Sequence, residues 1–216
     1  MVKIKICGLK RLEDIEIVNR YKPDFIGFVF ADSKRKVSHD LAGKLRSNLR
    51  NGIVPVGVFV DASQDEIIKL FEEGVIDMAQ LHGNESEEYI IELKEKTGNE
   101  LKIINAIEMS ENINLDDYSD TNADFLLFDS GKGSGKTFDW SLIRKNLKKD
   151  FFLAGGLNIS NISQAIEEFE PYAVDLSSGL ETDGFKDEKK IREIMEVINW
   201  VKDDMVNMVA NTYPKH

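Results

Sequence analysis

Hydrophobic positions along the chain form eight short runs, rich in β-branched and aromatic residues, separated by longer segments with apolar residues every three or four positions. The short runs predict β-strands, and the longer spacing predicts amphipathic α-helices. The predicted strands cover residues 2–7, 24–30, 53–60, 78–81, 101–106, 125–129, 151–154 and 173–177. The predicted helices cover residues 12–21, 39–49, 64–73, 85–96, 140–147, 159–169 and 188–206, with a less regular pattern over 109–118.

The regular alternation of these segments predicts the topology. Strands that each precede a helix form a parallel sheet with crossover helices. Segments 25–30 and 55–60 carry similar sequences, as successive strands of one closed barrel would. An open doubly wound sheet is the alternative, but the sequence Cys7-Gly8-Leu9-Lys10 after the first strand lacks the GxGxxG fingerprint of that fold. We therefore predict an α/β protein with a single (β/α)8 TIM barrel.

Residues 1–206 are predicted to form this one catalytic domain, and residues 207–216 a frayed tail, because the apolar rhythm stops there. Ser63 and Asn158 lie where helix N-caps are expected, and Gly74 lies where a helix should end. A chain of 216 residues with 42% hydrophobic content can bury one sizeable core.

The net charge and the cysteine content limit the classes of partner and the compartment that we expect. A formal net charge of -11 disfavours nucleic acid and anionic membranes, although it permits a small anionic substrate held by a few local donors. No apolar run approaches membrane-spanning length, and the first residues lack the apolar core of a secretion signal. Cys7 is the only cysteine, so no intrachain disulfide forms, and a reducing cytoplasm is the expected compartment.

Polar residues at the strand ends are the candidates for chemistry, because the carboxyl ends of barrel strands share one mouth. Cys7 ends the first strand, and a thiol can act as a base once nearby positive charge stabilises its thiolate. Asp129 ends the sixth strand behind an apolar run, where a raised pKa suits a general acid. The alternatives are a buried structural cysteine and a turn aspartate that accepts backbone hydrogen bonds.

Two glycine turns, at Gly155-Gly156 and Ser178-Gly179, follow the last two strands. Barrels often bind phosphate at these loops, because glycine lets backbone N–H groups approach an anion. Tight turns alone would also explain the glycines. The sequence therefore indicates a phosphorylated small-molecule ligand.

Three further features bear on the site. Arg35 could hold a substrate carboxylate bidentately, or it could be a solvated loop charge. His82 follows the fourth strand and could orient a substrate. The glycine-rich segment 131–137 narrowly misses the P-loop spacing, which favours a substrate lid. No residue grouping has metal-ligand spacing, so we predict no metal.

Several segments, taken together and in order, resemble the phosphoribosylanthranilate isomerase family. They include KICG at 5–8, GFVF at 27–30, SKR at 33–35, QLHG at 80–83, GSGKTFDW at 133–140 and VDLSSG at 174–179. The segment at 154–157 reads AGGL where the family usually has SGGL, which removes one hydroxyl and no backbone donor.

The resemblance implies a cofactor-free Amadori rearrangement of N-(5-phosphoribosyl)anthranilate in tryptophan biosynthesis. It implies Cys7 as general base, Asp129 as general acid and Arg35 as carboxylate clamp. Gly155, Gly156, Ser178 and Gly179 would form the phosphate cradle, and His82 and Asp175 would lie near the substrate. A monomer or a homodimer is expected.

Two rival functions remain. Another phosphosugar enzyme on the same barrel would usually need a metal or a lysine at a strand end, and no predicted strand ends in lysine. A non-catalytic phosphate binder would be expected to have lost the acid or the base, and Cys7 and Asp129 are both present.

Overall fold

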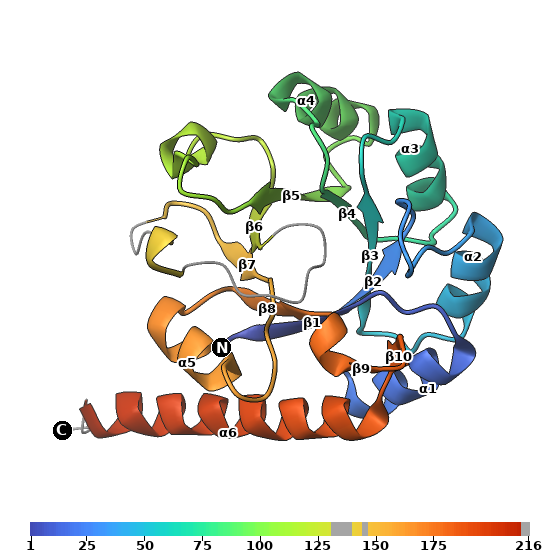
Figure 1. Ribbon diagram of the computed structural model, residues 1–216. Helices are drawn as coiled ribbons and strands as arrows, with labels where there is room; N and C mark the ends of the chain where they lie inside the picture. Colours follow the sequence, from blue (N-terminus) through green and yellow to red (C-terminus); the bar gives the residue numbers. More distant parts are fainter. Residues whose placement is uncertain (131–139, 144–146, 213–216) are drawn as a thin grey trace.

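The computed structural model describes the backbone of residues 1–130, 140–143 and 147–212, with side chains as far as Val201. Eight parallel strands close into a barrel in sequence order (Figure 1). They are β1 (Lys3–Cys7), β2 (Phe25–Val29), β3 (Val54–Phe59), β4 (Met78–Leu81), β5 (Lys102–Glu108), β6 (Phe125–Asp129), β7 (Phe151–Leu153) and β8 (Ala173–Leu176). The predicted (β/α)8 barrel is confirmed.

Helices surround the barrel and cover the outer face of its strands (Figure 1). They are α1 (Leu12–Tyr21), α2 (His39–Ser47), α3 (Gln64–Glu72), α4 (Glu87–Lys96), α5 (Ile162–Phe169) and α6 (Glu188–Thr212). The Ser63 hydroxyl caps α3 by accepting from the Glu66 N–H, and Gly74 follows this helix with a φ of 68°. Both predicted caps of α3 are confirmed. Among the described residues, no helix combines the length and apolarity needed to cross a membrane.

Two predicted helices are wrong in the part that the structure describes. Residues 109–118 contain only the 3-10 turn η1 (Leu115–Tyr118). Strand β5 continues to Glu108, two residues past its predicted end, and pairs with β6 as far as Asp129. In the segment 140–147, the described residues form only the 3-10 turn η2 (Trp140–Leu142). Residues 144–146 lie outside the description.

Asn158 is not the N-cap of α5, which begins at Ile162 after Asn161. The Asn158 carboxamide instead accepts from the Ser160 N–H at 2.9 Å and donates to the Gly156 carbonyl at 2.8 Å. These bonds close a turn over 158–160, which shortens the predicted helix by three residues. The correction matters for function, because the turn holds one of the two glycine loops in place.

The last part of the chain is more structured than predicted. After the 3-10 turn η3 (Ser178–Leu180), a short hairpin of β9 (Glu181–Thr182) and β10 (Phe185–Lys186) precedes α6. Helix α6 continues past Val206 to Thr212, so the backbone is helical in most of the segment predicted to fray. The helix packs against α1 and α5 (Figure 1). The division of the chain at residue 206 stays a prediction.

The barrel separates two apolar layers. The larger layer lies between strands and helices, where residues such as Ile4, Ile15 and Val18 pack. The smaller layer fills the barrel, with members that include Phe25, Ile104, Leu127 and Phe152. The Phe25 and Phe152 rings meet edge to face at a centroid distance of 5.3 Å. The interior is therefore a packed core and not a channel.

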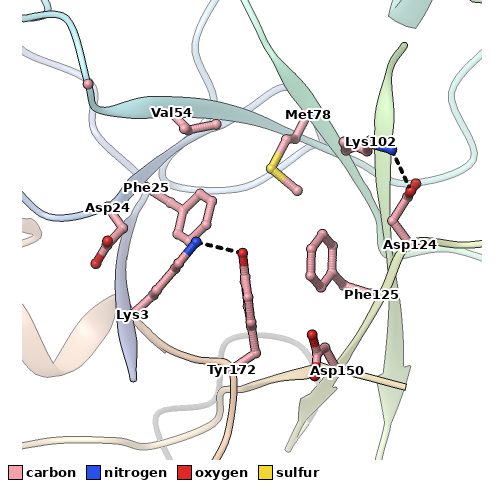
Figure 2. A pocket seen from close by; sticks show the side chains of 11 residues that line it. Lys3, Asp24, Phe25, Val54, Met78, Lys102, Asp124, Phe125, Asp150 and Tyr172 are labelled. Carbon is pink, nitrogen blue, oxygen red and sulfur yellow. Dashed lines mark hydrogen bonds and ion pairs between the residues drawn. The ribbon is translucent and has the colours of Figure 1, made fainter. Parts of the chain in front are cut away.

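A cavity of about 530 Å³ lies at the N-terminal ends of the strands (Figure 2). Four of its charged side chains have partners. The Lys3 ammonium donates to the Tyr172 hydroxyl at 2.7 Å, and Lys102 pairs with Asp124 at 3.0 Å. Asp24 and Asp124 also accept from the backbone N–H groups of Ile4 and Ile103. Because these contacts tie strand beginnings together, we assign this face to barrel stability.

Candidate active site

The carboxyl ends of the strands open into a second cavity, of about 430 Å³. All nine residues that the sequence placed at the barrel mouth line it: Cys7, Arg35, His82, Asp129, Gly155, Gly156, Asp175, Ser178 and Gly179. They come from β1, β6 and β8 or from the loops that follow strands. The predicted convergence of thiol, carboxylate, guanidinium and glycine turns is therefore present, whereas the role of each residue stays a prediction.

Cys7 is 8% exposed and packs beside Val29 and Val58. It fits because its neighbour on β2 is Gly27, where a Cβ atom would lie 2.6 Å from the Cys7 Sγ. Burial raises the pKa of the thiol. The positive charges of Lys5 and Lys186 oppose that shift, whereas the negative charge of Asp175 adds to it.

Asp129 lies at the end of β6 and is also 8% exposed. Its Oδ1 accepts from the Ser130 N–H at 2.8 Å, and its Oδ2 lies 3.5 Å from the His82 Nε2. Burial raises the pKa of this carboxyl group, and the negative charge of Asp175 raises it further against the effects of His82 and Ser130. A carboxyl group in this setting keeps its proton to higher pH, as a general acid requires.

A buried polar layer lies just below the cavity. The Lys5 ammonium donates to the Gln80 Oε1 and to the Asp175 Oδ2, both at 2.8 Å. Lys5 is 0% exposed and Gln80 is 2% exposed. The other carboxylate oxygen of Asp175, Oδ1, is buried without a hydrogen-bond partner in the described part of the chain. A buried acceptor left open in a residue that lines the cavity can receive a ligand hydroxyl.

Arg35 is engaged by the protein itself. Its Nε donates to the Glu181 Oε1 at 2.7 Å and its Nη2 to the Glu181 Oε2 at 2.9 Å. The Lys186 ammonium binds the same carboxylate at 2.7 Å, and against the effect of burial the two cations lower the pKa of Glu181 to about 2. The Nη1 of Arg35 makes neither of these bonds, so it can still bind an anion. Gly8, directly after β1 and with a φ of 85°, leaves room for the Arg35 side chain, which a Cβ atom there would meet.

The two glycine loops have a physical requirement for glycine. A Cβ at Gly155 would lie 2.7 Å from the Ser130 nitrogen, and a Cβ at Gly179 would lie within 2.3 Å of the Leu157 carbonyl oxygen. Gly155 and Gly156 have φ angles of 83° and 65°. Their N–H groups donate to no other described residue. Turn geometry and free donors therefore coexist, which is what an anion cradle needs.

Four polar residues at or near the cavity were not predicted from the sequence: Lys5, Gln80, Glu181 and Lys186. The signal for Lys5 was present, because Lys3, Lys5 and Cys7 alternate with isoleucines along β1. In a barrel whose outer face is covered by helices, that polar face has to point inward. Glu181 and Lys186 approach the mouth through the β9–β10 hairpin, which no periodicity announced.

Two further predictions from the sequence concern the lid and the metal. Residues 131–139, which carry most of the GSGKTFDW motif and the proposed lid, fall outside the described residues. Within the part of the chain that the structure covers, no three His, Cys, Asp or Glu side chains form a group that could hold a metal ion.

Comparison with known proteins places these features in a family. The sequence profile described as "N-(5'phosphoribosyl)anthranilate (PRA) isomerase" matches residues 4–197. The N-(5'-phosphoribosyl)anthranilate isomerase of Endomicrobium trichonymphae is 48% identical over 204 residues, which cover 92% of this chain and 98% of the relative.

Solved structures agree with the sequence matches. The phosphoribosyl anthranilate isomerase of Thermus thermophilus superposes with a TM-score of 0.83 at 30% identity, covering 93% of this chain and all (100%) of that one. A second such enzyme, in complex with reduced 1-(o-carboxyphenylamino)-1-deoxyribulose 5-phosphate, has a TM-score of 0.78 at 33% identity and coverages of 91% and 97%.

A third structure bears on assembly: monomers made from the dimeric enzyme of Thermotoga maritima have a TM-score of 0.79 at 32% identity, with coverages of 91% and 97%. The profile spans nearly the whole barrel, and the relatives match this chain along almost their full length. The chain therefore belongs to the phosphoribosylanthranilate isomerase family.

Proposed function

We propose that Asp129 and Cys7 are the general acid and general base of the family's isomerisation. That reaction converts N-(5′-phosphoribosyl)anthranilate to 1-(2-carboxyphenylamino)-1-deoxyribulose 5-phosphate in tryptophan biosynthesis. The observation that carries the proposal is that both side chains, from strands β1 and β6, line one cavity together with the residues predicted to bind substrate.

The first step is ring opening, which needs an acid. Asp129 donates its proton to the furanose ring oxygen as the bond from that oxygen to C1 breaks. The nitrogen lone pair forms the C1=N bond of a protonated Schiff base. The carboxylate left on Asp129 is stabilised by the Ser130 N–H at 2.8 Å and faces the His82 ring.

The second step is proton abstraction, which needs a base. The Cys7 thiolate takes the proton from C2, and the electrons of that C–H bond form a C1=C2 bond while the C=N electrons return to nitrogen. The resulting enolamine becomes the aminoketone when the C2 hydroxyl loses its proton and C1 gains one. The enzyme is left with a thiol and a carboxylate, which exchange protons with solvent before the next turnover.

Binding residues hold the sugar between these two groups. The free Nη1 of Arg35 suits the anthranilate carboxylate, and the N–H groups of Gly155 and Gly156, with Ser178 and Gly179, suit the phosphate. The open Oδ1 of Asp175 suits a sugar hydroxyl. With a carboxylate and a phosphate held, orientation supplies a large share of the rate.

No step of this scheme needs a cofactor, and every group named is a side chain or a backbone N–H. The base must remain a reduced thiol, which fits the reducing cytoplasm as its compartment. All proposed residues belong to one chain, so the scheme works in a monomer and equally in a homodimer.

The test is a fluorescence assay that follows consumption of freshly prepared phosphoribosylanthranilate. We expect Cys7→Ala and Asp129→Asn each to lower kcat by at least about 10²-fold, the usual size of a general acid–base contribution. A reduced product analogue should still bind both variants. Normal turnover in either variant would remove that residue from the mechanism.

A further inference from the structure

Lys5 is a fully buried cation that does not line the cavity, yet it connects the two proposed catalytic groups. Its ammonium donates to Gln80 and Asp175, and its positive charge acts on the Cys7 thiol, two residues along the same face of β1. An ammonium group carries three donors and no acceptor. Two of these donors are used by Gln80 and Asp175.

Because lysine cannot accept, its bond to Gln80 fixes which way the Gln80 carboxamide points. The oxygen faces Lys5 at 2.8 Å, so the Nε2 amide faces the His82 ring, 3.3 Å from its Nδ1. An amide nitrogen only donates, so the Nδ1 of His82 must accept. The ring proton of neutral His82 then sits on Nε2, which lies 3.5 Å from the Asp129 Oδ2.

We infer that Lys5 is a positioning residue: its ammonium stabilises the Cys7 thiolate on one side and, through Gln80, selects the His82 tautomer that faces Asp129 on the other. The inference rests on the roles proposed above for Cys7 and Asp129. It adds a chain of contacts, Lys5–Gln80–His82–Asp129, that begins beside Cys7 on β1 and crosses the barrel interior to Asp129.

In the described part of the chain, a small number of charged groups act on Cys7 and on Asp129. Lys5, Asp175, Lys186 and Arg35 act on the Cys7 thiolate. His82 and Asp175 act on Asp129. Removing Lys5 therefore withdraws a major support of the thiolate while Lys186 and Arg35 remain.

A purely structural role is the competing explanation: Lys5 would only neutralise Asp175. That role predicts loss of stability without a change in how Cys7 titrates or in where the His82 proton sits. The two explanations can be separated without turnover, because the chain has a single cysteine and three histidines.

The first measurement is the rate of Cys7 alkylation by iodoacetamide as a function of pH. We expect Lys5→Met to move the midpoint up by about one unit, which lowers the thiolate fraction about tenfold near neutral pH. Lys3→Met is the matched control, since it removes the same charge from the same strand at the opposite end of the barrel. It should leave the midpoint unchanged.

A second variant guards against misfolding, because Lys5→Met leaves the Asp175 carboxylate buried without its cation. Lys5→Met combined with Asp175→Asn leaves neither charge of that pair. Its midpoint should move in the same direction by a smaller amount, because the repulsion from Asp175 is also gone. An unchanged midpoint in either folded variant would overturn the inference.

The second measurement is the ring ¹⁵N spectrum of His82, assigned by its loss in His82→Gln and recorded where the ring is neutral. The native protein should give the Nε2–H pattern. Gln80→Leu should give a mixture of tautomers while leaving the Cys7 midpoint unchanged. A native Nδ1–H pattern, or no change in Gln80→Leu, would contradict the chain of contacts.

These readouts need no substrate, so they stand apart from the proposed catalytic roles. If Cys7→Ala kept normal turnover, the roles would fail while the titration and the spectrum still reported on Lys5. If the roles hold and the inference is right, Lys5→Met should lower kcat/KM about tenfold near neutral pH, in step with the lost thiolate.

Discussion

Two charged residues of this site bind a protein partner with some of their polar atoms and keep another polar atom for a ligand. Asp175 gives one oxygen to Lys5 and keeps the other without a partner among the described groups. Arg35 gives two nitrogens to Glu181 and keeps Nη1. Such groups are held in place before a ligand arrives, which reduces the entropy lost on binding.

The dependence of rate on pH follows from the two raised pKa values. Both the Asp129 carboxyl and the Cys7 thiol keep their protons to higher pH than usual, and the thiol remains the weaker acid. The active form, with Asp129 protonated and Cys7 ionised, is then a minor species at every pH. Below the pKa of Asp129, raising the pH increases kcat/KM by forming thiolate; above the pKa of Cys7, it decreases kcat/KM by removing the last protonated carboxyl.

We therefore expect a bell-shaped profile of kcat/KM whose descending limb coincides with the midpoint of Cys7 alkylation. The usual assignment of a base to the ascending limb is reversed here. Steady-state kinetics and alkylation, measured on one preparation, check this. An alkylation midpoint that coincided with the ascending limb would contradict the order of the two pKa values.

Arg35 should act in binding. Arg35→Lys keeps the positive charge. It loses the planar guanidinium, which binds Glu181 with two nitrogens and has Nη1 left for a ligand. We expect KM to rise roughly 10- to 100-fold, as loss of a hydrogen bond between charged groups implies, with a small change in kcat. Lys34→Ala, next to it and exposed, is the control and should leave both constants unchanged. A loss confined to kcat would exclude the clamp.

The site residues at strand ends were predictable from the sequence, whereas the residues beneath them were not. Cys7, Asp129 and the glycine turns stand next to strand boundaries, where barrel topology alone assigns a location. Lys5 sits inside a strand, and its meaning depends on which face turns inward. The pairing of Arg35 with Glu181 joins residues 146 positions apart, which one sequence cannot reveal.

At the scale of elements, the positions of the strands were predictable and the lengths of their connections were not. Apolar runs located all eight strands, because most of their positions are buried. Helix boundaries failed where side chains closed local turns, as Asn158 does with Ser160 and Gly156. The apolar spacing of residues 109–118 and 140–147 did not distinguish a 3-10 turn from a helix.

The packing of β1 against β2 gives a sharp test of strand geometry. Gly27→Ala would put a methyl group 2.6 Å from the Cys7 sulfur. We expect kcat to fall about 10²-fold, as a displacement near 1 Å of a reacting group can cause. Unfolding should become about 1–3 kcal/mol easier from overpacking.

Gly43→Ala is the matched control for that substitution. Gly43 lies inside α2, and a Cβ there meets nothing within 4 Å. This change should leave kcat alone and stabilise the fold by about 0.5–1 kcal/mol, as alanine does in a helix. Turnover and chemical denaturation measure both variants. Equal kcat in Gly27→Ala and the native chain would show that the glycine is not required by Cys7.

At the scale of the whole molecule, the two ends of the barrel have different tasks. The N-terminal end ties strands together through paired charges and aromatic rings (Figure 2). The C-terminal end gathers Cys7, Asp129, Arg35 and Asp175 around the cavity. A net charge of -11 does not prevent anion binding, because Arg35 and the loop N–H groups act at contact distance.

The site should be complete in one copy of the chain. All nine predicted residues line a cavity formed by a single barrel, so specific activity should stay constant as the enzyme is diluted through any dimer dissociation. Initial rates over a wide range of enzyme concentration, with sedimentation at the same concentrations, measure this. Activity that fell together with the dimer fraction would place a needed group on a second copy.

The buried layer of Lys5, Gln80 and Asp175, above an interior filled by Phe25, Phe152 and their neighbours, closes the barrel from below. Within the described residues, the cavity is therefore closed at its base and open at the carboxyl ends of the strands. Product leaves and substrate enters through this opening, and both bind the same site of the free enzyme. Accumulated aminoketone should therefore slow turnover as a purely competitive inhibitor.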